Sequence, residues 1–256
     1  MEFLTIFLSS LLSAISPGGF IVDRIVENTL RSQVKAVEQL EVRIDNAPSY
    51  QFLQGKVERI RIASRGVQPI SDVRIEALEL ETDPISINFQ HLQQKGRGAV
   101  REALRQPLQG GVRLVLTEAD LNRALQAKEI QSRLQRLVNN LQGGGGQAGG
   151  YELLNPRLDL LGNNRLRLQV QVLRPRSQGK PPQNWNITLE LGISVVEGWR
   201  LELSDPVGTL NGRKLSSRIL NEFAKGIASS LDLRALEKRG IIARLLQLEI
   251  TSDEID

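Results

Sequence analysis

Few of the residues in this chain could support catalysis. The only histidine is His91 and there is no cysteine, so a histidine metal cluster and thiolate chemistry are excluded, and a Ser-His-Asp triad would depend on this one imidazole. Neither Gly-x-Ser-x-Gly nor His-Glu-x-x-His occurs. Residues 96–98, Gly-Arg-Gly, lack the third glycine and the following acid of a dinucleotide site. We therefore expect a protein that is not an enzyme and that uses no cofactor or metal.

Two other stretches could bind phosphate groups. Residues 142–150 are rich in glycine, but no strand precedes them and no Gly-Lys-Ser/Thr follows, so we predict a flexible loop. The basic loop that follows Leu173 carries Arg174, Arg176 and Lys180. Because arginine's planar fork suits phosphate oxygens, this loop could contact headgroups at a membrane surface. Solvated loop charge is the alternative.

The composition limits the class of partner. Hydrophobic residues make up 40% and charged residues 24%, which indicates a folded protein, and the net charge of +4 mildly favours anionic partners. Aromatic residues are only 4%, and the polar faces of the predicted strands carry Arg, Gln, Thr and Glu instead of rings that stack bases. Nucleic acid is therefore not expected as a partner, although RNA binding through the basic loops stays an alternative.

Two long alternating segments, residues 165–173 and 186–196, organise the chain. Aliphatic residues occupy one parity of each segment and polar residues the other, as expected for antiparallel strands with one apolar face. Amphipathic helices must cover this face, and the best candidate is the helix that begins near Leu215. The residues that we expect to line the interior are Leu166, Leu168, Val170, Val172, Ile187, Leu189, Leu191 and Ile193, facing Ile219, Phe223 and Ile227.

The remaining segments predict an α+β fold. A five-turn amphipathic helix is expected from Val22 to Leu40, followed by short strands with a bulge or bend near Ala77. Thr117 is expected to cap a helix, Asn211-Gly212 to begin the last long helix, and residues 246–250 to form a final strand. No repeated βαβ units occur, so long antiparallel strands packed on helices are preferred.

The N-terminal segment points towards a membrane. Residues 3–22 carry no charge and are about as long as a membrane span, but serines dilute them and Pro17-Gly18-Gly19 interrupts them. Glu2 stands where a secretory signal would carry Lys or Arg. We expect residues 1–19 to be a membrane anchor, an atypical signal or an interfacial helix, with a true span as the remaining alternative. A single domain over residues 20–250 and an acidic tail over 251–256 complete the predicted organisation.

Three stretches together resemble the LmeA-like phospholipid-binding family. They are the N-terminal helix, the run from Gly55 to Val67, and the run Leu116-Thr117-Glu118-Ala119-Asp120-Leu121-Asn122. The resemblance implies a module like the tubular lipid-binding (TULIP-like) proteins, with a long curved antiparallel sheet wrapped around a helix and an apolar tunnel or groove. It also implies bacterial proteins that bind or move lipids in the cell envelope, and it offers no catalytic residues.

Together these observations predict non-catalytic binding, and possible transfer, of a phospholipid or another apolar ligand at the membrane surface, in the envelope or periplasm. The cytoplasmic side of the membrane stays an alternative. Burying one methylene contributes about 0.8 kcal/mol, so an acyl chain needs no polar handle. Aliphatic strand faces usually just form a core, however. A structural or protein-binding envelope module with a packed interior is therefore the first alternative.

Overall fold

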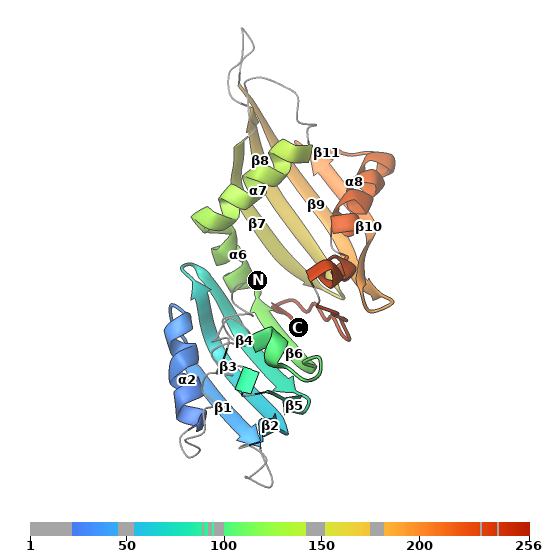
Figure 1. Ribbon diagram of the computed structural model, residues 1–256. Coiled ribbons are helices and arrows are strands. Elements are labelled where there is room, and N and C mark those ends of the chain that lie inside the picture. The colour runs from blue at the N-terminus through green and yellow to red at the C-terminus, as the bar shows by residue number, and fades with distance from the viewer. Residues whose placement is uncertain are drawn as a thin grey trace. The chain divides into compact units, whose positions relative to one another are not determined.

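The computed structural model describes residues 22–45, 54–88, 90–91, 94, 100–141, 152–174, 182–230, 232–239 and 241–256. Two compact units divide the chain, Met1–Val115 and Leu116–Asp256. Antiparallel sheets with a few helices build both units, which confirms the predicted α+β class (Figure 1). The expected N-terminal segment 1–19 and glycine-rich loop 142–150 lie outside the described residues. None of the described helices is long and apolar enough to cross a membrane.

An antiparallel sheet of order β1-β3-β4-β6 forms the first unit. Its apolar face is buried where α2 packs, with Leu30, Leu40, Ile60 and Ile62 in one hydrophobic cluster. The elements are α2 (Val22–Gln33), β1 (Gln39–Asp45), β2 (Lys56–Val57), β3 (Arg59–Ile70), β4 (Val73–Thr82), β5 (Ile85–Ser86), α5 (Val100–Ala103) and β6 (Gly110–Thr117).

Two predictions for the first unit were wrong. The N-terminal helix ends at Gln33 and does not reach Leu40, because Leu40 begins a period-two alternation and pairs opposite Ser64 in the sheet. No bulge lies at Ala77, which pairs in regular register with Arg65, whereas a bend there stays a prediction. The register shift lies between Val67 and Ile70, and the apolar residues of β4 change face within a ladder of regular register.

The second unit contains the organising strands in an antiparallel sheet of order β11-β10-β9-β8-β7. The last two residues of β6, Leu116 and Thr117, belong to this unit and pair with β12. The elements are α6 (Glu118–Gln126), α7 (Lys128–Leu141), β7 (Glu152–Gly162), β8 (Arg165–Arg174), β9 (Gln183–Val196), β10 (Arg200–Leu210), β11 (Arg213–Lys214), α8 (Ser217–Ser230), η2 (Leu233–Arg239) and β12 (Glu254–Ile255).

Local chemistry explains where these elements begin and turn. The Thr117 hydroxyl accepts a hydrogen bond from the Asp120 amide at 3.1 Å, which confirms the predicted helix cap. Asn163 and Asn164 adopt positive φ angles of 50° and 56° in the hairpin turn between β7 and β8. Residues 211–212 form a second hairpin turn, between β10 and β11, and not the predicted helix start, because asparagine and glycine also favour that turn.

The C-terminal segment differs from the predicted final strand. Residues 241–249 form no strand ladder, and Ile250 forms an isolated bridge to Ile255. The side chain of Asn164 binds this segment, accepting from the Ile250 amide at 2.7 Å and donating to the Leu248 carbonyl at 3.3 Å. These two hydrogen bonds hold the segment in place of the strand pairing that the alternating sequence predicted.

The close approach of α8 to the sheet depends on Gly208 in β10. A methyl group at this position would come within 2.8 Å of the buried Leu220 side chain and 3.3 Å of the Thr188 carbonyl oxygen. We predict that Gly208→Val destabilises the second unit by about 1–3 kcal/mol through overpacking. Urea unfolding followed by tryptophan fluorescence checks this, since both tryptophans, Trp185 and Trp199, lie in this unit.

Gly111→Val in β6 is the control for the change of residue type, because an added methyl group there meets nothing within 4 Å. Circular dichroism follows its unfolding, since Gly111 lies in the first unit and the tryptophans do not. Adding Leu220→Ala to Gly208→Val should recover part of the loss relative to the sum of the two single changes. Full additivity of the two changes would show that the helix does not approach the sheet at this glycine.

Candidate functional site

The candidate site is the apolar face of the β7–β11 sheet. Strand register places the predicted residues in rows, with Leu166 opposite Leu191, Leu168 opposite Leu189, and Val170 opposite Ile187. The face extends beyond the predicted set in both directions along these rows. The added residues are Leu158, Leu160, Trp185, Leu203 and Leu210.

Burial divides this face into a covered part and a partly open part. Leu189 and Leu191 are 6% and 5% exposed and pack against Leu220 of α8, and Val172 is 8% exposed. The other predicted lining residues of the strands are only half-buried, although the sequence places them on the same face. These half-buried residues are Leu166, Leu168, Val170, Ile187 and Ile193.

Helices lie over the outer strands of this face. The α8 helix packs beside β10, and α6 with α7 packs beside β7, while β8 and β9 run between them (Figure 1). The helix α8 includes Ile219, Phe223 and Ile227, but their side chains lie outside the described ones, so their facing towards the sheet stays a prediction. In their place, Leu220 and Ala224 are the described α8 side chains that are buried.

The predicted headgroup contacts are only partly described. Arg174 is the last residue of β8 and is half-buried, whereas Arg176 and Lys180 lie outside the described residues. Within the part of the chain that the structure describes, no group of three or more His, Asp or Glu side chains could hold a metal ion.

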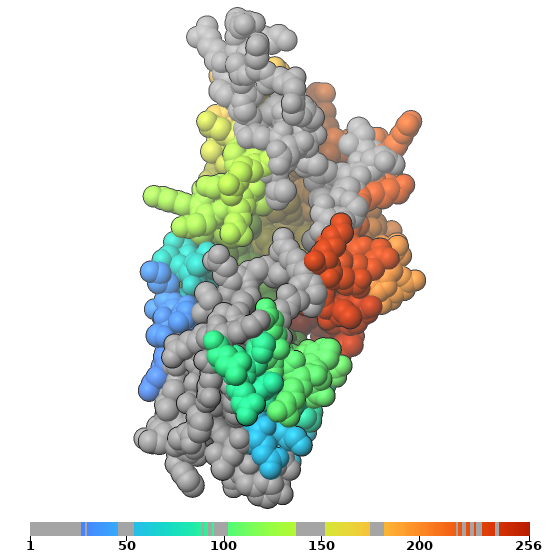
Figure 2. All heavy atoms as spheres, in the orientation of Figure 1, coloured from blue at the N-terminus to red at the C-terminus, as the bar shows by residue number. Residues whose placement is uncertain are grey.

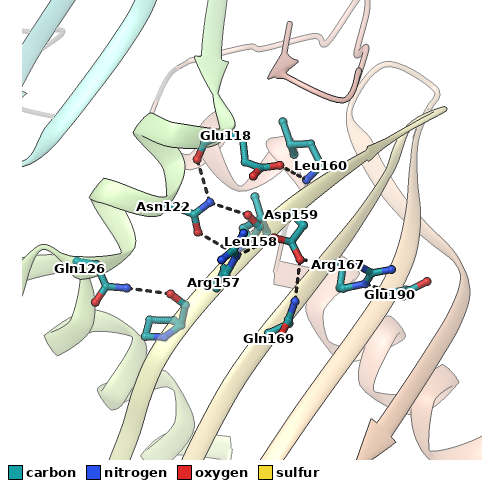
Figure 3. Close-up of polar contacts among 11 residues, drawn as sticks. Glu118, Asn122, Gln126, Arg157, Leu158, Asp159, Leu160, Arg167, Gln169 and Glu190 are labelled. Atoms are coloured by element: carbon teal, nitrogen blue, oxygen red, sulfur yellow. Dashed lines mark hydrogen bonds and ion pairs between the residues drawn. The ribbon is translucent and has the colours of Figure 1, made fainter.

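A row of polar side chains on α6 forms hydrogen bonds with the backbone N–H and C=O groups at the free edge of β7 (Figure 3). Glu118, Asn122 and Gln126 recur every four residues and so share one face of the helix. Glu118 Oε2 accepts from the Leu160 amide at 2.8 Å, and Gln126 Nε2 donates to the Pro156 carbonyl at 2.9 Å. These bonds give the edge strand the partners that a neighbouring strand would otherwise supply.

Asn122, in the middle of this row, both donates and accepts a hydrogen bond. Its Oδ1 accepts from the Leu158 amide at 2.9 Å and its Nδ2 donates to the Leu158 carbonyl at 2.7 Å. Gln135 of α7 adds a fourth anchor, accepting from the Leu153 amide at 3.0 Å. We name the four side chains, Glu118, Asn122, Gln126 and Gln135, the edge ladder. Sequence reasoning missed it, because polar residues at this spacing usually mark a solvated helix face.

We predict that Asn122→Ala lowers the free energy of unfolding of the second unit by about 1–3 kcal/mol, because the Leu158 amide and carbonyl lose their partner in a part-buried place. Gln126→Ala removes one bond and should cost about half as much. Urea unfolding followed by tryptophan fluorescence measures both. Lys128→Ala, an exposed change at the start of α7, is the control. Equal effects of Asn122→Ala and Lys128→Ala would contradict the prediction.

The opposite face of the sheet carries a charged network centred on Asp159. Its carboxylate accepts from Arg157 Nε at 2.8 Å and from Gln169 Nε2 at 2.7 Å, and Arg167 pairs with Glu190 at 2.7 Å. Burial acts to raise the pKa of Asp159, but the hydrogen bonds from Arg157 and Gln169 and the charges of Arg157 and Arg167 outweigh it. The pKa of Asp159 therefore lies below its ordinary value.

A depressed pKa stabilises the fold above the unfolded-state pKa, about 3.9 for aspartate, and the contribution is lost as pH falls through the folded-state pKa. We predict that Asp159→Asn costs about 1 kcal/mol at neutral pH, since the side chain is 17% exposed and the pairing is partly screened. The cost should shrink steadily below about pH 4. The urea midpoints of the wild-type and Asp159→Asn proteins across this pH range measure the cost. Glu202→Gln, a change at an exposed position of β10, is the control. A pH-independent cost would contradict the prediction.

These features define an α+β protein in which helices flank a sheet whose aliphatic face is partly open. Comparison with known families then places the chain: it belongs to the LmeA-like phospholipid-binding family, which it matches over residues 14–256. The family resemblance carried by the sequence is therefore confirmed. No curated protein and no solved structure matches the chain.

Proposed function

We propose that this protein binds a phospholipid without catalysis and holds its acyl chains against the half-buried apolar face of the β7–β11 sheet. The observation that carries the proposal is the split burial of one continuous aliphatic surface. Leu189 and Leu191 are closed off by α8, whereas Leu168, which pairs opposite Leu189, and Val170 and Ile187 in the adjoining row stay half-buried. Membership of a phospholipid-binding family supports an acyl chain as the molecule that completes their burial.

The energetic case needs only apolar contact. Each methylene moved out of water contributes about 0.8 kcal/mol, so a sixteen-carbon chain gains on the order of 12 kcal/mol before the cost of ordering it. Aliphatic side chains on adjacent pleats form a smooth surface along which a hydrocarbon chain can lie. The sheet offers this surface over β8 and β9, whose rows are formed by Leu, Val and Ile.

Headgroup and location follow from the same proposal. Arg174 ends β8 and continues into the loop with Arg176 and Lys180, so these cations could meet the phosphate at that end of the sheet. A TULIP-like wrap, carriage of lipid in the cell envelope, and a membrane-associated N-terminal segment belong to this proposal. They are supported by the family and by the uncharged residues 3–22.

Lipid retention tests the proposal. We expect native mass spectrometry of the gently purified full chain to show an added mass of phospholipid size, which solvent extraction then identifies. Val170→Asp should lower lipid occupancy at least about tenfold, because a carboxylate against an acyl chain is costly to desolvate. Val170→Thr keeps the shape of the side chain and should give a smaller loss, which separates an effect on the ligand from unfolding.

Ser194→Asp is the matched control, because it places the same carboxylate on the exposed opposite parity of β9. Circular dichroism and tryptophan fluorescence should show that all three variants fold. Repeated absence of lipid from the wild-type protein, or equal lipid occupancy in Val170→Asp and Ser194→Asp, would favour a packed structural module instead.

A further inference from the structure

The segment 241–250 of the second unit presents aliphatic side chains to solvent. Leu246 is 93% exposed and Ile242 is 78% exposed, more than the other exposed large hydrophobics of the described residues. In Figure 2 the residues of η2 and those that follow it, in orange-red to red, form part of the visible surface. One exposed aliphatic side chain is ordinary, but apolar side chains that gather on one surface can mark a site of contact with a membrane or another protein.

Hydrogen bonds to the rest of the second unit hold the backbone of this segment in place, so its exposed side chains have a defined position. The Leu245 amide donates to the Gly198 carbonyl at 2.6 Å, and Asn164 holds the backbone of Leu248 and Ile250. Ile250 itself is only 2% exposed. Leu246 is therefore held outwards between fixed points.

Alternation along the segment creates a mixed surface. The side chains of Ile242, Arg244 and Leu246 are exposed, while those of the residues between them, Ala243 and Leu245, are half-buried. The exposed side chain of Arg244 thus lies, along the chain, between two exposed aliphatic side chains. This order matches the boundary of a bilayer, where hydrocarbon and phosphate lie within the reach of one arginine side chain.

The neighbouring turn between β9 and β10 adds an aromatic ring and further cations. The guanidinium carbon of Arg234 lies 3.5 Å from the ring centroid of Trp199, and that of Arg200 lies 5.4 Å from it. Gly198 in this turn is also adjacent to Arg244, whose Cδ would lie 3.6 Å from a Cβ at that position. The turn and the segment thus form one continuous surface. Tryptophan with arginine is typical of membrane interfaces.

The ion pairs determine which of these charges can attract an anionic surface. Asp232 neutralises Arg234 at 2.7 Å, whereas Arg244 approaches Glu237 only at 3.8 Å. Hydrogen bonds from Arg234 lower the pKa of Asp232, and the charge of Arg200 also helps to lower it. Arg200 and Arg244 are therefore less tightly paired than Arg234, and their charge can also act on external anions.

We propose that Trp199, Arg200, Ile242, Arg244 and Leu246 form a docking surface for an anionic lipid bilayer, with the aliphatic groups in the hydrocarbon boundary and the arginines at phosphate level. The surface lies beyond the last residue of β9, at the opposite end of that strand from the loop that contains Arg176 and Lys180. It is therefore distinct from the headgroup contacts suggested above. Docking does not require a bound acyl chain.

A site-specific probe tests this surface in the full chain. Because the chain has no cysteine, Leu246→Cys and Ile242→Cys each give a unique attachment point for an environment-sensitive fluorophore. Vesicles of equal parts phosphatidylcholine and phosphatidylglycerol should raise the emission and shift it to shorter wavelength, with quenching by lipids that carry a quencher in the acyl chain. The same probe at Val207→Cys, a position 52% exposed on β10, should not respond.

Charge neutralisation tests the polar part of the surface. Arg200→Gln together with Arg244→Gln should reduce the vesicle affinity reported by the probe about tenfold, since each arginine near an anionic surface contributes to binding. Arg213→Gln, an exposed change on β11, should leave it unchanged. Equal probe responses at Leu246→Cys and Val207→Cys would overturn the proposal. So would a response that grows with protein concentration without vesicles, which would indicate self-association.

The two proposals can fail separately. Val170→Asp should reduce retained lipid while leaving the vesicle response of the Leu246→Cys probe intact. The unlabelled Leu246→Cys protein should retain as much lipid as the wild type. If Val170→Asp also abolished the vesicle response, the proposal that this surface docks independently of the bound lipid would be overturned.

Discussion

The antiparallel register of the second sheet is the constraint on which the rest of that unit depends. It places Leu166, Leu168 and Val170 directly beside Leu191, Leu189 and Ile187, so a pattern that is weak in each strand becomes one broad aliphatic surface. Burial of this surface away from water is energetically favourable, and α8 buries the part around Leu189 and Leu191. The proposed lipid site depends on this partial cover.

The helices beside β7 show how the sheet can keep an open face without exposing an open edge. The edge ladder uses side chains to satisfy backbone groups of β7, so α6 is held by polar bonds at the margin of the sheet and not only by apolar packing over its centre. A helix fixed in this way can flank the apolar face without filling it. The charged network around Asp159 meanwhile keeps the other face in water.

What the sequence could predict follows from the range of the interactions. The two long strands and the Thr117 cap were predictable, because the pleat and the first helical turn determine them within a few residues. The end of α2 at Gln33 and the turn at Asn211-Gly212 were not, since the same residues suit two local structures and the sheet decides between them. The edge ladder required knowledge that α6 lies beside β7, which no local pattern in Asn122 or Gln126 contains.

In the first unit, too, the described helices bury only part of the apolar face of the sheet. Its face is closed where α2 packs, with Ile60 0% exposed, yet at β6 Val112 is 60% and Leu114 41% exposed, opposite Leu80 and Leu78. Val112 and Leu114 belong to the same face as Ile62, because Leu80 pairs with both Ile62 and Val112 and Leu78 pairs with both Ser64 and Leu114. Within the described residues, both units thus leave aliphatic side chains of one sheet face incompletely buried, and this shared feature is the one on which the proposed binding of an apolar ligand depends.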